Sequence, residues 1–212
     1  MIGPFSNITP FHLDILKEIG NIGAGHAATA LSSLLNKGVD MKVPAVKVVA
    51  FDEITELIGG PEAIVASVFL RVNGEAPGAM FFMMPVNQAA YLVQSLMGED
   101  DEIHDEFSEM AFSALQETGN ILAGSYLSSL SDFTGMKLAP SVPATTVDMA
   151  GAVLSFGLME ISAVSDSAIV IETAFTGMND EHGESLKGQF FLLPDPGSYR
   201  KIFHALGVSI DE

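Results

Sequence analysis

Hydrophobic and polar residues follow the same order of patterns in each half of this chain. Each half opens with a long stretch of helical periodicity that follows a favourable N-cap residue, Thr9 in the first half and Ser108 in the second. A β-branched segment comes next, then a short helical segment, two strongly apolar segments of strand length and a closing amphipathic helix. The pattern therefore predicts one set of elements that occurs twice.

The predicted elements have the following bounds. In the first half we expect a helix from after Thr9 to near Gly38, a strand over residues 43–51, a short helix over 53–58, strands over 64–72 and 79–84, and a helix after Pro85. In the second half we expect a helix from after Ser108 to near Gly135, a strand over 142–148, a helix over 150–161, strands over 168–175 and 189–193, and a helix after Pro194. Residues 99–106 are expected to form an acidic linker, and residues 176–188 a surface loop.

The two halves also share residues. Residues 18–25 (EIGNIGAG) recur as residues 117–124 (ETGNILAG), 99 positions later, and residues 81–85 recur as 190–194, 109 positions later. Such self-similarity indicates a tandem duplication, with repeats at about 9–98 and 108–207. We expect a single α+β domain over residues 1–212 rather than a βαβ unit. It should have pseudo-twofold symmetry, a shared and mainly antiparallel sheet, and the two long helices side by side on one face.

Composition excludes several classes of function. The 212 residues are 48% hydrophobic and 17% charged, which excludes intrinsic disorder. The formal charge of −18 argues against nucleic acid and against anionic membrane surfaces. The sequence has no cysteine, so thiol catalysis is excluded, and its five histidines lack ligand spacing, so we expect no metal site. The first ten residues do not resemble a signal peptide and no apolar run is long enough to span a membrane, so we expect a cytoplasmic protein.

One side of each long helix carries the repeated polar residues. At about 100° per residue, four positions of each helix fall within a narrow sector. The first stripe is Asp14, Glu18, Asn21 and Gly25, and the second stripe is Ser113, Glu117, Asn120 and Gly124. Both Asn side chains are expected to face solvent. The positions expected to pack inward are Ile15, Ile19 and Ile22 in the first helix, with Met110, Ala114 and Ile121 as candidates in the second.

The stripes suggest chemistry on a phosphoryl group. Glycine is costly inside a helix, so Gly25 and Gly124 would let the backbone of a partner approach, whereas Gly20 and Gly119 would serve close packing. An Asn amide both donates and accepts hydrogen bonds, so it can hold a water for attack on phosphorus. Residues 72–136 contain no Lys or Arg, so a cation that neutralises the phosphate must arrive with a partner. A nucleotide-binding loop is set aside, because the glycines do not follow a strand in the order G-x-G-x-x-G.

The spacing of the stripe residues resembles a known family. Asp or Ser, three residues, Glu, two residues, Asn, twenty-two residues and Pro is similar to the repeated signature of CheC-type phosphatases, and the chain carries it twice, ending at Pro44 and Pro143. Within the group formed by CheC, CheX and FliY, the two motifs resemble the CheC branch most. CheX is shorter with one motif per chain, and FliY carries an extra flagellar-switch domain.

The resemblance implies an activity and a set of roles. CheC-type proteins hydrolyse the aspartyl phosphate of the chemotaxis response regulator CheY, which supplies its own Mg²⁺ and a Lys. Asn21 and Asn120 would then orient the attacking water, and Glu18 and Glu117 would engage that Lys. The remaining motif residues would support docking (Asp14, Ser113) or shape the turn after the helix (Pro44, Pro143).

The same resemblance implies a second partner, the receptor deamidase CheD, whose surface we place near Asp148. The alternative function is a non-enzymatic adaptor, either a CheD regulator or a fragment of a flagellar-switch protein. Intact Glu and Asn in both copies favour the enzyme, because one copy of a scaffold should have drifted. We expect two independent sites, equal or unequal, in a protein that is a monomer.

Overall fold

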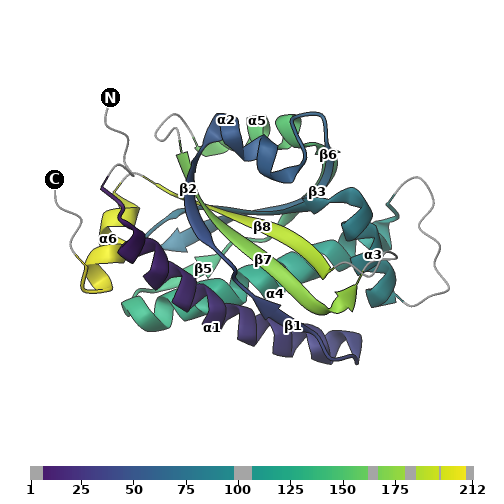
Figure 1. Cartoon of the computed structure of the whole chain (residues 1–212), viewed down its shortest axis with the longest axis horizontal. Helices are drawn as coiled ribbons and strands as arrows, with labels where there is room; N and C mark the ends of the chain where they lie inside the picture. Colours follow the sequence, from purple (N-terminus) through teal and green to yellow (C-terminus); the bar gives the residue numbers. More distant parts are fainter. Residues whose placement is uncertain (1–6, 98–106, 162–166, 180–184, 196, 209–212) are drawn as a thin grey trace.

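Helices cover both faces of one antiparallel sheet (Figure 1). The structure, a computed structural model, describes residues 7–97, 107–161, 167–179, 185–195 and 197–208. The long helices α1 (Pro10–Leu35) and α4 (Glu109–Thr134) lie side by side on one face. The opposite face carries α2 (Phe51–Ile54), the 3₁₀ helix η1 (Thr55–Ile58) and α5 (Ala150–Ile161), while α3 (Val86–Met97) and α6 (Ser198–Ala205) lie at the two ends of the molecule.

The sheet is built reciprocally from the two halves. Its strands are β1 (Asp40–Lys42), β2 (Val46–Ala50), β3 (Ile64–Gly74), β4 (Gly78–Pro85), β5 (Leu138–Pro140), β6 (Ala144–Met149), β7 (Ser167–Asn179) and β8 (Ser185–Pro194). Their order is β1-β7-β8-β4-β3-β5, with β2 also paired to β7 and β6 to β3. The first two strands of each half therefore pair with the third strand of the other half.

The central pair of strands fixes the symmetry. Between β4 and β8, Phe81 pairs with Phe191 and Phe82 pairs with Phe190. The repeat maps Phe81 onto Phe190 and Phe82 onto Phe191, so each of these pairs is the image of the other, as a twofold axis through this point requires. The predicted fold class, an α+β duplication with a shared antiparallel sheet and two long helices on one face, is confirmed.

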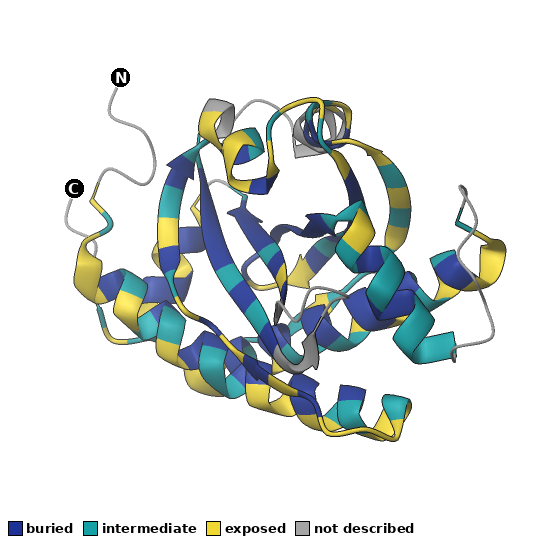
Figure 2. Cartoon of the chain, turned by 45° about the vertical axis from the view of Figure 1, so that its right-hand side comes forward, coloured by how far each residue is buried: buried dark blue, intermediate teal, exposed yellow. Residues whose placement is uncertain are grey.

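Two apolar layers hold the sheet to its helices. Alternate residues of β4 point to opposite faces, so Met80, Phe82 and Met84 join the core beneath α1 and α4, while Phe81 and Met83 join the core beneath α2 and α5. The central strands are accordingly dark blue in Figure 2, and exposed residues gather on the outer sides of the helices. A strand covered on both faces needs no polar alternation, which explains the continuous apolar run of β4.

Several predicted bounds need correction. The strands predicted over 43–51 and 142–148 begin later, at Val46 and Ala144, and the short strands β1 and β5 before them were not predicted. Pro44 and Pro143 lie in the breaks, since proline has no N–H to donate to a ladder. Helix α1 ends at Leu35, before Gly38, and its C-cap residue Asn36 has a φ of 48°, in the left-handed region. The predicted surface loop is wrong in part, since β7 and β8 extend into residues 176–188. The linker at 99–106 lies outside the described residues.

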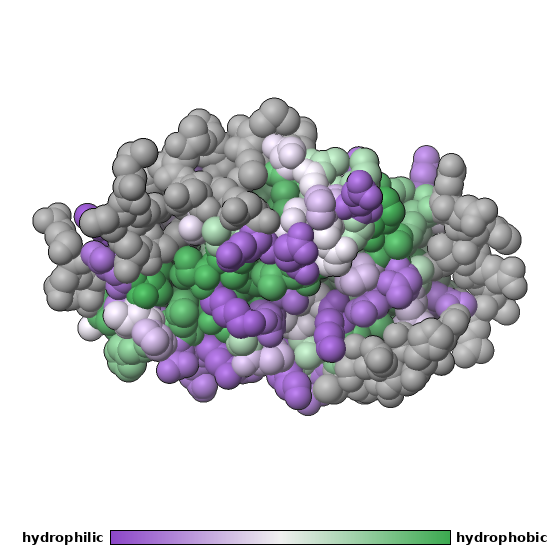
Figure 3. All heavy atoms as spheres, turned by 45° about the horizontal axis from the view of Figure 1, so that its top comes forward, coloured by the Kyte–Doolittle hydropathy of each residue, from purple (hydrophilic) through white to green (hydrophobic). Residues whose placement is uncertain are grey.

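The outer surface mixes apolar and polar residues. Figure 3 shows hydrophobic residues in a band among hydrophilic ones on the side that carries α2 and α5. Among the helices that the structure describes, none combines the length and the apolar character that crossing a membrane requires.

Candidate functional site

The N-terminus of each long helix is held firmly, which gives the stripes a rigid base. The backbone N–H of Thr9 donates to Nδ1 of His12 at 3.0 Å, and Oγ of Ser108 accepts the N–H of Ala111 at 3.1 Å. Phe107, just before the N-cap of α4, packs on Phe112 with ring centroids 6.0 Å apart, as in a hydrophobic staple.

Both stripes lie on the outer side of their helices. In the first stripe Asp14, Glu18 and Gly25 are exposed and Asn21 is half-buried, and in the second stripe Ser113, Glu117 and Asn120 are exposed and Gly124 is half-buried. The opposite sides of α1 and α4 form the core. Each helix therefore gathers its four predicted residues on one accessible face, and the catalytic and docking roles assigned to them stay predictions.

Some predicted packing positions differ from the structure. Ile19 is buried, but Ile15 and Ile22 are only half-buried, because the inward side of α1 is centred on small residues that let the helix approach α4 and the sheet. Met110 is 64% exposed, so its predicted packing role is wrong.

The glycines of the two helices fall into two groups. A Cβ at Gly20 would come within 3.3 Å of Val43, one at Gly23 within 3.0 Å of the Tyr126 backbone, and one at Gly119 within 2.5 Å of Val68. These glycines permit close packing, as expected for Gly20 and Gly119. A Cβ at Gly25 or Gly124 would meet nothing within 4 Å. Packing within the described chain therefore gives no reason for glycine on the stripes.

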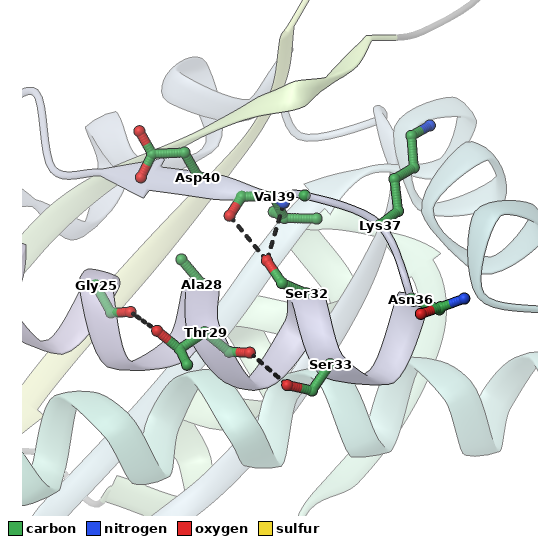
Figure 4. A pocket seen from close by; sticks show the side chains of 10 residues that line it. Gly25, Ala28, Thr29, Ser32, Ser33, Asn36, Lys37, Val39 and Asp40 are labelled. Carbon is green, nitrogen blue, oxygen red and sulfur yellow. Dashed lines mark hydrogen bonds between the residues drawn. The ribbon is translucent and has the colours of Figure 1, made fainter.

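The surface beyond Gly25 is hollowed. An open groove of about 570 Å³ runs from Gly25 along the C-terminal part of α1 to Asp40 (Figure 4). Its wall is tied together by Ser32, whose Oγ accepts the N–H of Val39 at 2.9 Å and donates to the Val39 carbonyl at 3.0 Å. The end of the first stripe thus opens onto free space rather than onto a neighbouring element.

The two Asn side chains differ in their hydrogen bonds. The Oδ1 atom of Asn21 accepts the backbone N–H of Val43 at 2.8 Å, and its Nδ2 atom donates to the carbonyl of Lys17 at 3.0 Å. The amide is thereby fixed, yet one N–H and one lone pair stay available. Asn120 is exposed and makes no side-chain hydrogen bond within the described part of the chain. The expectation that both side chains simply face solvent is therefore wrong for Asn21.

The proline at the end of each motif lies in the break between two strands. Pro44 follows Val43, which lies between β1 and β2 and is only 2% exposed. Val142 precedes Pro143 at the equivalent place between β5 and β6, yet it is 84% exposed. In the first half the spacing from Asn to Pro places the amide of Asn21 on the residue before the proline. The turn-shaping role assigned to Pro44 and Pro143 stays a prediction.

The other predicted residue, Asp148, lies away from the stripes. It is exposed near the end of β6, on the strand edge that leads into α5, and its Oδ1 atom accepts the N–H of Met149 at 2.7 Å. In the described residues there is no group of three His, Asp or Glu side chains that could hold a metal ion.

Buried polar chemistry lies beneath the helix pair rather than on the stripes. Tyr126 of α4 packs against Gly23 of α1, and its hydroxyl lies 3.1 Å from Oγ1 of Thr173. Burial raises the pKa of Tyr126 to about 12, although the hydrogen bond to Thr173 lowers it in part. The tyrosine is therefore a structural link between the two helices and the sheet.

Comparisons with known proteins agree with the double motif. The model of the CheC-like family matches residues 11–48 and 110–147, two segments that begin 99 residues apart. The chain is 48% identical over 208 residues to the CheY-P phosphatase CheC of Bacillus subtilis, covering 97% of this chain and 99% of the relative. It is 33% identical over 138 residues to the flagellar motor switch phosphatase FliY of the same organism, covering 65% of this chain and 36% of that protein.

Solved structures share the fold. The crystal structure of Thermotoga maritima FliY superposes with a TM-score of 0.76 at 21% identity, covering 94% of this chain and 98% of that one. A FliM chain from a complex with SpeE of H. pylori superposes with a TM-score of 0.69 at 16% identity, covering 94% and 96%. The 48% identity to CheC over nearly the whole chain and the two family matches confirm the resemblance stated from the motifs, and the chain belongs to the CheC-like family.

Proposed function

We propose that this chain hydrolyses the aspartyl phosphate of the response regulator CheY. The observation that carries the proposal is the repeated stripe: a Glu and an Asn one turn apart on an accessible, firmly capped helix, followed by a glycine with open space above it. The relative that is 48% identical over nearly the whole chain is a CheY-P phosphatase, which supports the same activity here.

The Asn side chains position the attacking water. An Asn amide that donates and accepts hydrogen bonds holds a water in line with the acyl phosphate, where proximity and orientation do most of the catalytic work. The water oxygen bonds to phosphorus as the bond between phosphorus and the aspartyl oxygen breaks. The products are the free Asp carboxylate of the regulator and inorganic phosphate, which receives both protons of the water. Asn21 and Asn120 are the groups that we assign to this step.

The positive charge comes with the substrate. The second stripe lies in a segment without Lys or Arg, and the chain as a whole carries a formal charge of −18. The Mg²⁺ and the Lys that neutralise the phosphoryl group therefore belong to the regulator. Glu18 and Glu117, one turn before the Asn residues and exposed, would pair with that Lys and orient the two proteins.

The two sites are expected to differ in strength. Asn21 is fixed in one orientation by Val43 and Lys17, whereas Asn120 has to be ordered when the regulator binds. Preorganised groups lose less freedom in the transition state. We therefore expect Asn21 to contribute at least as much turnover per site as Asn120.

The test measures the loss of phosphate from labelled CheY-P with the wild-type protein, each single Asn→Ala variant and the Asn21→Ala/Asn120→Ala double variant. We expect acceleration by wild type, partial activity in the singles, and a loss of about 10²-fold or more in the double variant, the scale of a removed positioning group. Asn73→Ala, an exposed Asn on β3, serves as the matched control. Unchanged decay of CheY-P with wild type, despite binding, would favour the alternative, a non-enzymatic docking module.

A regulatory contact with CheD is the finer part of the proposal. The exposed carboxylate of Asp148 lies near the end of β6 and pairs with Val65, which belongs to the core beneath α2 and α5, so it lies on the side of the sheet opposite the stripes. We expect Asp148→Lys to weaken the capture of CheD while the phosphatase rate with CheY-P alone stays unchanged. Equal capture by both proteins would reject Asp148 as part of that surface.

A further inference from the structure

The N-terminal turn of each long helix exposes one large apolar side chain. Phe11 is 62% exposed and Met110 is 64% exposed. They occupy equivalent places, because the 99-residue offset that relates the stripes also maps Phe11 onto Met110. An exposed apolar residue occurs singly on many proteins, but one that recurs in both repeats on the side of the helix that also carries the stripe calls for a common cause.

The structure of the helix start does not supply that cause. The apolar positions of a staple are the residue before the N-cap and the fourth helical residue, here Ile8 with Leu13 and Phe107 with Phe112. Phe11 and Met110 are the second helical residues and point elsewhere. Among the described residues, the only ring contact of Phe11 is an edge-on one with its neighbour His12, with centroids 6.5 Å apart.

The helical geometry places these side chains in line with the stripes. Phe11 precedes Glu18 by seven residues, and Met110 precedes Glu117 by seven. Seven residues amount to about two turns, which is about 10 Å along the axis and about 20° around it. Each stripe therefore begins with an apolar side chain, continues through an acidic residue and ends at the Asn and the open glycine.

We propose that Phe11 and Met110 are apolar anchors that dock the receiver domain of phosphorylated CheY onto the two stripes. The inference rests on the proposed function and adds residues that recognise the substrate without reaching its phosphoryl group. A protein substrate that presents a cation to Glu18 or Glu117 covers the neighbouring turns of the helix as well, and its apolar side chains beside the phosphoryl pocket would pack on Phe11 or Met110. A second copy of this chain is a poor occupant, because a formal charge of −18 and acidic stripes repel each other.

The same helices offer a matched control. Leu34 and Phe133 are also equivalent under the 99-residue offset, and each is 50% exposed. They lie sixteen residues after Glu18 and Glu117, which places them about 160° around the helix from the stripes. They share the size, the exposure and the helices of the anchors but not the face.

The experiment compares Phe11→Gln/Met110→Gln with Leu34→Gln/Phe133→Gln in steady-state turnover of CheY-P and in binding to CheY activated with beryllium fluoride. Apolar anchors at the centre of an interface cost more than about fivefold in affinity when removed. We expect the anchor variant to raise KM and Kd about tenfold with kcat unchanged, and the control variant to change neither. A fall in kcat at constant KM, or equal effects of the two variants, would overturn the proposal.

The outcomes separate this inference from the proposed function. If wild type dephosphorylates CheY and the anchor variant has the same KM and Kd, the anchors are rejected and the phosphatase is kept. If wild type binds CheY without dephosphorylating it, and only the anchor variant binds more weakly, the phosphatase is rejected and the anchors are kept as a docking surface. Wild-type protein that neither binds nor dephosphorylates CheY rejects both.

Discussion

Removing the amide of Asn21 should cost folding stability, whereas removing the amide of Asn120 should not. The Oδ1 atom of Asn21 is the acceptor for the backbone N–H of Val43, and Val43 is almost fully buried between β1 and β2. Asn21→Ala leaves that N–H without a partner in the protein. A buried polar group that loses its hydrogen bond costs about 1–3 kcal/mol.

The opposing effect is the gain in helix propensity. Alanine is favoured over asparagine inside a helix by about 0.5 kcal/mol. Asn21→Ala should therefore lower the free energy of unfolding by about 0.5–2.5 kcal/mol, which is a fall in Tm of about 1–10 °C for a chain of this size. Asn120 has only the second effect, because its side chain is exposed and Val142, the residue equivalent to Val43, already faces solvent. Asn120→Ala should leave Tm unchanged or raise it slightly.

Thermal and urea unfolding, followed by circular dichroism, measure both variants against wild type. The activity of Asn21→Ala has to be compared at a temperature well below its own Tm, so that a loss of turnover reports on the water and not on unfolded protein. Equal shifts in Tm for the two variants would refute the structural role assigned to Asn21. So would an unchanged Tm for Asn21→Ala together with lost activity, since the amide would then act on substrate alone.

Two further predictions concern the helix pair. Gly25→Ala/Gly124→Ala should raise the free energy of unfolding, since a Cβ there meets nothing and alanine is favoured by about 1 kcal/mol per position, yet it should slow CheY-P turnover if a partner approaches these points. Gly119→Ala, whose Cβ would meet Val68, should lower the free energy of unfolding instead. Unfolding curves and phosphate-release assays distinguish the two variants. The stability conferred by the raised pKa of Tyr126 is fully present below about pH 10, the pKa of a tyrosine in the unfolded chain, and is lost toward pH 12. The difference in unfolding free energy between wild type and Tyr126→Phe should therefore fall by about 1.4 kcal/mol per pH unit across that window. Parallel curves of unfolding free energy against pH for the two proteins would contradict the assignment.

Much of the fold could be predicted because the sequence repeats itself. The blocks that recur at offsets of 99 and 109 required two similar halves, and the apolar run at 81–85 required a strand covered on both faces. The exchange of strands between the halves is a different matter. Which of β3 and β7 receives β1 and β2 depends on the packing of whole elements, and no local pattern distinguishes the two arrangements.

The stripes were accessible to the same reasoning because α-helical geometry is regular. Once Glu18 and Asn21 were placed on a helix, their common face followed from the angle per residue. Phe11 was within reach of the same argument, since the offset pairs it with Met110, but Met110 was placed among the candidate packing positions. Hydrophobic character predicts burial on average, and it fails at positions where a partner covers the side chain.

The motif alone could not predict the difference between the two sites. Val43-Pro44 and Val142-Pro143 are the same dipeptide at the same distance from an Asn, and proline restricts the residue before it in the same way in both. Yet Val43 packs over Gly20 and brings its N–H to Asn21, whereas Val142 is exposed and the Oγ atom of Ser141 before it accepts the N–H of Arg71. Gly119, the counterpart of Gly20, is covered by Val68 instead, so the space that Val43 fills in one half is filled by β3 in the other. A duplicated sequence therefore yields one Asn that is part of the fold and one that is free of it, because the surroundings of each copy come from different strands.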